Sequence, residues 1–200
     1  APSFEVKDRP CIIVKLSDFK DNMVLLQFVN QVSPMSDRQF EMLKEFSPSN
    51  SLRSLGCYAF ANDSVFSDFV VPNSLAYIGE YAFYNSGVKK LVLGNLPFRK
   101  DIVQACSSLE AVEVSNSNVS FQSKDGVIFS KDGRKILFFP FGKMPPIYEI
   151  PNSVIAIGDS AFYEANKLRA LVIPESVKSI GKNAFGNSSI LEVKALPGNP

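Results

Sequence analysis

A nine-residue phrase recurs in this chain at a fixed spacing. It reads LRSLGCYAF at 52–60, LAYIGEYAF at 75–83, VIAIGDSAF at 154–162 and VKSIGKNAF at 177–185. The glycine and the phenylalanine return after the same interval within each pair of neighbouring copies, from Gly56 to Gly79 as from Phe162 to Phe185. A fixed period of this size is typical of stacked repeat arrays, in which one unit is too small to bury its apolar side chains alone. The repeats therefore predict a solenoid that offers a binding surface rather than a catalytic pocket.

The residue types within one repeat indicate how its coil packs. Gly158 permits either a positive φ or the close approach of a neighbouring coil, and Ala161 is small where coils press together. Asp159 and Ser160 are suited to cap a single helical turn. Leu171 and Ile173 form an apolar strand end before a proline. The repeated phenylalanines are expected to stack as an aromatic column of core residues, which comprises Phe60, Phe83, Phe162 and Phe185.

The regular array is interrupted between its two halves. A degraded fifth repeat surrounds Val103, and the next phenylalanine of the pattern, Phe162, follows it after more than two periods instead of one. An insertion is therefore expected at about 115–150. Two Asp-Gly pairs lie in this stretch, at 125–126 and 132–133, and Asp-Gly between apolar runs is a strong hairpin signal. We predict a small antiparallel meander with strands at 119–122, 127–130 and 135–139.

Residues 1–47 do not follow the repeat and are predicted to be an N-terminal cap or degenerate repeats, since terminal units of solenoids are atypical. The tail of a preceding module is a further interpretation of this segment. Residues 48–197 form the predicted array. The organisation is therefore a single elongated repeat array with an irregular beginning.

Composition excludes several classes of function. The 200 residues carry 21 basic and 20 acidic side chains, so the chain lacks the basic stripe of a nucleic-acid-binding protein. No apolar stretch reaches the length that spans a membrane. The absence of histidine removes the commonest general base and the usual zinc ligand. We therefore expect no enzyme activity and no cofactor. The three cysteines, an odd number, predict free thiols rather than a disulfide framework.

The phrase IPNSVIAIGDSAF at 150–162, followed by Leu168, Leu171 and Ile-Pro, resembles the BspA-like (Treponema-type) leucine-rich repeat. Residues 72–93 and 174–197 resemble it too, and the hairpin at 125–133 is similar to an interlude common between such repeats. The resemblance covers about residues 48–197. The cysteine usual three residues after the phenylalanine is present only as Cys106, which is a departure from the family pattern.

The resemblance implies an α/β fold. This is a right-handed, strand-rich leucine-rich-repeat solenoid with short parallel strands on one face and turns or short helices on the other. It also implies a secreted or cell-surface protein of a bacterium or protist, with a role in adhesion or in binding host macromolecules.

Strand alternation predicts which residues of the array face outward. If Leu171 and Ile173 face the core, Val172 faces solvent, and the matching positions of other repeats follow. This outward row mixes charged and apolar residues, which suits a protein partner better than a polyanion. An alternative is that these are only solvent-tolerant strand positions. The candidate binding residues are Asp68, Val70, Lys90, Val92, Glu113, Val172 and Ala195.

The leading functional hypothesis is a non-enzymatic secreted or cell-surface binding module. It would act in adhesion or protein–protein interaction through the strand face, with a host or extracellular-matrix macromolecule as partner. One alternative is a structural spacer of a larger surface protein. Another is a carbohydrate-binding module that uses exposed aromatic residues, for which the candidates are Tyr84, Phe98, Phe141, Tyr148 and Tyr163.

Overall fold

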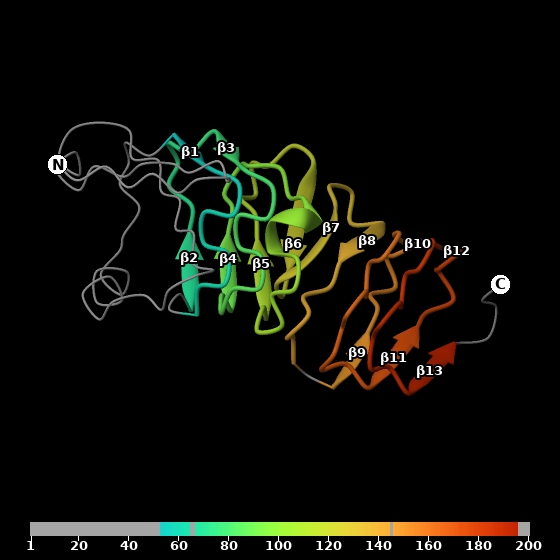
Figure 1. The fold of residues 1–200 in the computed structure, drawn as a ribbon. Helices are drawn as coiled ribbons and strands as arrows, with labels where there is room; N and C mark the ends of the chain where they lie inside the picture. Colours follow the sequence, from blue (N-terminus) through green and yellow to red (C-terminus); the bar gives the residue numbers. More distant parts are fainter. Residues whose placement is uncertain (1–52, 65–66, 145, 196–200) are drawn as a thin grey trace, which may run out of the picture. The chain divides into compact units, whose positions relative to one another are not determined.

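The computed structural model describes residues 53–64, 67–144 and 146–195 (Figure 1). These residues form a strand-rich repeat solenoid, in which successive coils contribute short parallel strands one repeat apart. The predicted N-terminal cap or degenerate repeats at 1–47 lie outside the described residues. Two compact units are present. The first comprises the residues up to Val88 together with Arg99–Cys106, and the second comprises Lys89–Phe98 together with the residues from Ser107 onward.

The first unit contains three short strands and the helical segment η2 (Lys100–Val103). The strands are β1 (Ser54–Leu55), β2 (Asp68–Val70) and β3 (Tyr77–Ile78). β1 and β3 pair in parallel, with Leu55 opposite Ile78, so partner residues are one repeat apart. Their inward side chains, together with those of the turns that follow, make a buried apolar core that includes Leu55, Phe60, Ile78, Phe83 and Val103.

The second unit contains two sheets and a separate parallel pair. β4 (Lys90–Val92) pairs in parallel with β5 (Ala111–Glu113). A three-stranded parallel sheet has the order β13-β11-β9, and a five-stranded mixed sheet has the order β12-β10-β8-β7-β6. The remaining strands are β6 (Phe121–Lys124), β7 (Val127–Ser130), β8 (Lys135–Phe138), β9 (Ile147–Glu149), β10 (Ala156–Ile157), β11 (Ala170–Ile173), β12 (Ser179–Ile180) and β13 (Glu192–Ala195).

The strands β6, β7 and β8 pair antiparallel in chain order, as the Asp-Gly signals predict. The first of them starts two residues later than expected. β8 also pairs in parallel with β10, with Ile136 opposite Ile157. This strand therefore belongs both to the antiparallel hairpin region and to the ladder of the coils.

Residues that follow β8 repeat the coil pattern, although the sequence pattern places them in the insertion. The backbone N–H of Phe139 donates to the carbonyl of Ala161 at 2.7 Å, as that of Phe162 donates to Ala184 at 2.7 Å. β9 then takes the same position as β11, with Tyr148 opposite Leu171. The second half of 115–150, from β8 onward, thus belongs to the ladder of the coils.

The predicted aromatic column is present within each unit. The rings of Phe60 and Phe83 stack with centroids 5.3 Å apart. In the second unit, Phe162 stacks on Phe139 at 5.1 Å and meets Phe185 at 5.7 Å. Phe139 is a member of the column that the repeated phrase does not predict.

The bend that precedes each repeated phenylalanine contains a glycine because neighbouring coils approach closely there, and not because the glycine has a positive φ. A Cβ on Gly79 would lie 2.5 Å from the carbonyl carbon of Gly56 in the preceding coil, and one on Gly181 would lie 2.6 Å from that of Gly158. The left-handed conformation falls instead on the residue two places before the phenylalanine, such as Ser160 with φ 50°. The single helical turn predicted at 159–162, with Asp159 or Ser160 as its cap, is absent, because a left-handed residue interrupts it and the segment forms hydrogen-bonded turns.

We expect the substitution Gly79→Ala to lower the free energy of unfolding by about 1–3 kcal/mol, because the added methyl group meets backbone atoms that cannot move independently. The change should appear as a lower urea midpoint, followed by circular dichroism. Asn73→Ala, at an exposed position of the same unit, is the control and should leave the midpoint in place. An unchanged midpoint for Gly79→Ala would mean that the two coils can separate at little cost.

Candidate strand-face binding surface

The strands β9, β11 and β13 lie side by side in one sheet (Figure 1). Their register arranges the outward residues of this sheet in two rows. On β11, Leu171 and Ile173 are buried, while Ala170 and Val172 are partly exposed. Strand register then sets the neighbours of these two outward residues. Ala170 lies opposite Ile147 and Glu192, and Val172 lies opposite Glu149 and Lys194. We call these six residues the outer face of β9-β11-β13.

This outer face combines apolar and charged groups. Ile147 is 55% exposed, and Val172 is partly exposed between Glu149 and Lys194. Neighbouring strands in a sheet lie about 4.8 Å apart, so the carboxylate and the ammonium group flank a narrow apolar strip. Ile147 and Glu149 are not among the predicted site residues, because the sequence pattern assigns 115–150 to the insertion.

Ala195 does not belong to the outer face, contrary to the sequence prediction. It lies opposite Ile173, which is buried, while Lys194 lies opposite Val172. The coil that contains β13 has one residue fewer between its phenylalanine and its strand than the coil that contains β11. Aligning the two strands from the prolines that follow them therefore shifts each residue of β13 by one position. Ala195 is exposed because β13 is the edge strand of its sheet among the described residues.

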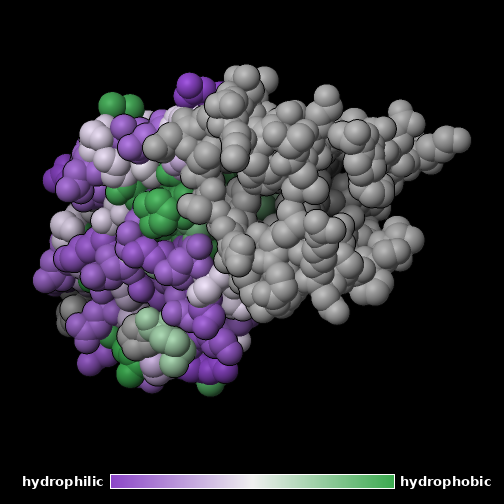
Figure 2. All heavy atoms as spheres, turned by 90° about the vertical axis from the view of Figure 1, so that its left-hand side faces the viewer, coloured by the Kyte–Doolittle hydropathy of each residue, from purple (hydrophilic) through white to green (hydrophobic). Residues whose placement is uncertain are grey.

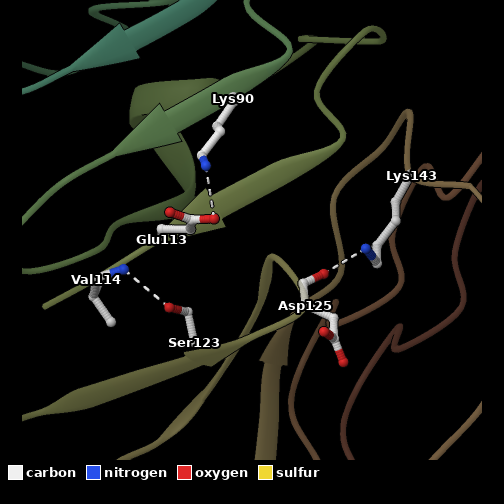
Figure 3. A network of polar contacts seen from close by, with 6 residues as sticks. All are labelled: Lys90, Glu113, Val114, Ser123, Asp125 and Lys143. Atoms are coloured by element: carbon white, nitrogen blue, oxygen red, sulfur yellow. Dashed lines mark hydrogen bonds and ion pairs between the residues drawn. The ribbon is translucent and has the colours of Figure 1, made fainter. Parts of the chain in front are cut away.

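The pair β4–β5 presents a second group of predicted residues. Leu91 and Val112 are buried in the strand centres, and the flanking residues Lys90, Val92 and Glu113 are partly exposed. The Lys90 Nζ atom lies 2.9 Å from Glu113 Oε1 across the two strands (Figure 3). Because the two side chains are 39% and 42% exposed, solvent screens the pair, and it contributes at most about 1 kcal/mol to stability. Its main effect is to make this patch electrically neutral.

In the first unit, β2 orients its residues as predicted. Phe69 is buried, and Asp68 and Val70 are exposed on the opposite side. Six of the seven predicted residues therefore lie on outward strand positions. Lys90, Val92 and Glu113 share one strand pair, and Val172 lies on the outer face of β9-β11-β13.

Buried polar contacts hold the segment between β5 and β7 in place. The side chain of Asn118 is 2% exposed, accepts from the backbone N–H groups of Ser120 and Phe121 at 3.0 Å, and donates to the Leu96 carbonyl at 3.1 Å. The Val114 N–H donates to Ser123 Oγ at 3.0 Å (Figure 3). Asn118 stands in a formal glycosylation sequon, but its buried and bonded amide cannot accept a glycan in the folded chain.

The turn between β6 and β7 is tied to the coil by Lys143. Asp125 and Gly126 both have positive φ, as a tight hairpin turn requires. The Lys143 ammonium donates to the carbonyl oxygen of Asp125 (Figure 3). Burial lowers the pKa of Lys143, and the carboxylates of Asp125 and Glu110 oppose that shift. The hairpin is therefore anchored rather than free to swing over the strands.

The aromatic residues proposed for carbohydrate binding are mostly unavailable. Phe98 and Phe141 are buried, and burial raises the pKa of the Tyr148 hydroxyl. Tyr163 accepts a hydrogen bond from Asn187 at 2.7 Å. Tyr84 is partly exposed and packs edge-on against two other tyrosines of the first unit, Tyr58 and Tyr81, whose own rings stack 5.2 Å apart.

Little in the described residues suggests catalysis. Cys106 is buried, its Sγ atom donates to the Phe83 carbonyl at 2.7 Å, and burial raises the pKa of its thiol, so it is a poor nucleophile at neutral pH. Over the ranges described, no three His, Cys, Asp or Glu side chains are grouped so that they could hold a metal ion. Within the same ranges, the structure has no helix with the length and apolar character needed to cross a membrane.

Several solved structures are similar to this chain. A leucine-rich repeat protein from Eubacterium ventriosum is 24% identical, with a TM-score of 0.55 over 75% of this chain and 47% of that one. The pneumococcal vaccine antigen PcpA is 27% identical over 74% of this chain and 32% of its own, with a TM-score of 0.47. A leucine-rich cell surface protein from Faecalibacterium prausnitzii is 21% identical over 73% of this chain and 34% of its own, with a TM-score of 0.44.

The chain thus spans less than half the length of each of these structures. No curated protein matches the chain with statistical significance. The sequence profile of the BspA-type leucine-rich repeat region matches residues 27–130 and 146–199 in six copies, which is most of the chain. With its parallel strands stacked one repeat apart, the chain belongs to the family of BspA-type leucine-rich repeat proteins.

Proposed function

We propose that this chain is a non-enzymatic protein-interaction module that acts outside the cell, secreted or held at the surface, and binds a partner protein in adhesion. Membership of the BspA-type family supports this class of function. The observation that carries the choice of surface is the outer face of β9-β11-β13. Ile147 and Val172 form an apolar strip there, flanked by Glu149, Glu192 and Lys194.

An apolar centre with a charged rim is the usual composition of a protein–protein interface. The central strand β11 is fixed by its buried inward residues Leu171 and Ile173, so this part of the surface is formed before a partner arrives and little ordering entropy opposes binding. Repeat arrays commonly use such extended surfaces for binding. On the side of the molecule that Figure 2 shows, the described surface is mainly hydrophilic, and its hydrophobic residues form small separate patches.

The test is a binding assay on immobilised collagen, laminin and fibronectin, chosen as extracellular-matrix proteins. We expect the double variant Ile147→Lys/Val172→Lys to weaken binding at least tenfold, because two ammonium groups would be desolvated in the interface. Circular dichroism should remain that of the parent chain, since both positions face solvent or are only partly covered.

The matched control is Val119→Lys, which adds the same charge at an exposed valine in the loop between β5 and β6. It should bind as the parent chain does. Unchanged binding by the double variant would remove the outer face of β9-β11-β13 as the site. Absence of binding to every protein tested would favour the structural-spacer alternative.

The tyrosine group of the first unit supports a second candidate, carbohydrate binding. Tyr58 is exposed, Tyr81 stacks on it, and the Asn85 side chain donates to Asn62 at 2.8 Å on the same bends. Aromatic rings beside amides offer both stacking and hydrogen-bonding groups to a sugar. A glycan array distinguishes the two functions, because a signal that Tyr81→Ala removes and Ile147→Lys/Val172→Lys preserves would assign the ligand to the tyrosines.

A further inference from the structure

Backbone bonds between neighbouring coils place two cationic residues on one row of the five-stranded sheet. The N–H of Ile155 donates to the Arg134 carbonyl, and the N–H of Lys178 donates to the Ile155 carbonyl, both at 2.8 Å. These three residues directly precede β8, β10 and β12, which lie side by side (Figure 1). Because neighbouring strands are about 4.8 Å apart, two strand spacings, or about 10 Å, separate the backbones at Arg134 and Lys178.

A third cation lies on the adjacent row. Lys135 is opposite Ala156, and Ala156 is opposite Ser179. The next residues along β8 and β10, Ile136 and Ile157, are buried in the core, so strand alternation directs Lys135 and Ala156 outward. We call the residues of these two rows the basic strip, which comprises Arg134, Lys135, Ile155, Ala156, Lys178 and Ser179.

The three cations of the basic strip are exposed, and none forms a salt bridge within the part of the chain that the structure describes. Asp132, just before the strip, accepts from Ser130 Oγ at 2.6 Å and from the backbone N–H of Arg134 at 3.0 Å, so its carboxylate is held at its own turn. Lys178 Nζ donates to the backbone carbonyl of Glu175 at 2.9 Å. The strip therefore has a local excess of positive charge in a chain that is nearly neutral as a whole.

The composition of the basic strip favours a hydrated anionic polymer over other partners. Ile155, 40% exposed, is the one large apolar residue of the strip, whereas a protein interface has an apolar centre that is depleted in lysine. The strip has no aromatic ring on which a nucleic-acid base could stack. The small side chains of Ala156 and Ser179 leave room between the cations for a polar chain to lie against the sheet.

We propose that the basic strip binds a linear acidic polysaccharide, whose sulfate or carboxylate groups contact Arg134, Lys135 and Lys178. The guanidinium of Arg134 offers a planar fork of donors to one anionic group, and the two ammonium groups act as point charges. A polyanion releases condensed counterions when it binds such a surface, so its affinity falls as salt rises. This site lies on a different sheet from the outer face of β9-β11-β13 and is additional to the proposed protein-binding function.

The test is isothermal titration calorimetry of the full chain at low ionic strength. The probes are heparin, which carries sulfate and carboxylate groups, and hyaluronan, which carries carboxylates alone. Arg134→Gln/Lys135→Gln/Lys178→Gln should raise the dissociation constant for heparin about tenfold or more and make its salt dependence shallower, because three ionic contacts are lost. All three side chains are exposed, so the circular dichroism spectrum and the thermal midpoint should match those of the parent chain.

The matched control removes the same three charges elsewhere in the second unit. Lys89, Lys124 and Lys167 are exposed and do not belong to the basic strip. Lys89→Gln/Lys124→Gln/Lys167→Gln should bind heparin as the parent chain does, because the net charge changes equally while the strip is intact. An equal loss of affinity in the two triple variants would overturn the proposal, since it would reflect overall charge.

The remaining outcomes are also decisive. Binding of hyaluronan as well as heparin would support a site for which carboxylates suffice, and binding of heparin alone would support a site for sulfate groups. A parent chain that binds neither polymer would overturn the proposal. Poly-L-glutamate bound more tightly than heparin, with the same loss in the strip variant, would also overturn it in favour of an acidic polypeptide. Tyr81→Ala should leave heparin binding unchanged, which separates this site from the tyrosine group.

Discussion

Phe162→Ala is expected to lower the free energy of unfolding of the second unit by about 3–5 kcal/mol. The side chain is fully buried and lies between two other rings of the aromatic column, with Phe139 at 5.1 Å and Phe185 at 5.7 Å. Its removal leaves a cavity that both neighbours line, and the backbone of the adjoining coils prevents collapse. Urea unfolding followed by circular dichroism measures the loss.

The column supplies its own control. Phe185 occupies the same position in the next coil but is only partly buried, because no further described ring covers it. Phe185→Ala should therefore cost much less than Phe162→Ala. If the two variants were equally destabilised, burial between neighbouring rings would not be the source of the effect.

Asn118→Ala is the second substitution with a large expected effect. The side chain bonds two backbone donors and two backbone acceptors, and each buried group left unpaired costs about 1–3 kcal/mol. The lost bonds connect the loop at Leu96 with the start of β6, so the hairpin should also lose its attachment to the preceding coil. The expected result is a lower urea midpoint together with earlier proteolytic cleavage near residues 115–121.

Asn116→Ala is the matched control, because this neighbouring asparagine is exposed. Its carbonyl, which accepts from Lys131 Nζ at 2.8 Å, is retained in the alanine variant. The control should unfold and be cleaved as the parent chain is. A parent-like midpoint for Asn118→Ala would show that water replaces the amide without cost.

The regular part of the fold could be predicted from the sequence because its residues repeat at the coil spacing. The glycine and phenylalanine positions recur at one fixed interval, and the structure pairs Leu55 with Ile78 and Ile157 with Ile180 at the same offset. Alternation within a strand then orients Phe69 inward and Val70 outward. Both inferences use geometry that every coil shares.

The irregular parts could not be placed in this way. Phe139 precedes Phe162 by one full period, but the glycine and alanine that mark the other bends are missing before it, so the repeated phrase does not reveal the coil containing β8. The sequence pattern assigns the outward position of β13 to Ala195, because a single deletion is invisible when strands are aligned from their prolines. Which residues gather on one surface depends on pairings such as β9 with β11, which spacing alone does not determine.

The double role of β8 has a consequence for how the second unit opens. Its two edges are bonded to β7 and β10, whereas β12 and β13 are edge strands among the described residues. Amide protons at the centre of the five-stranded sheet should therefore exchange with solvent only in the rarest and most extensive openings, while those of the last coil exchange through local fraying. The hairpin gives the parallel coils a slow-exchanging anchor in mid-chain, from which protection declines toward β13.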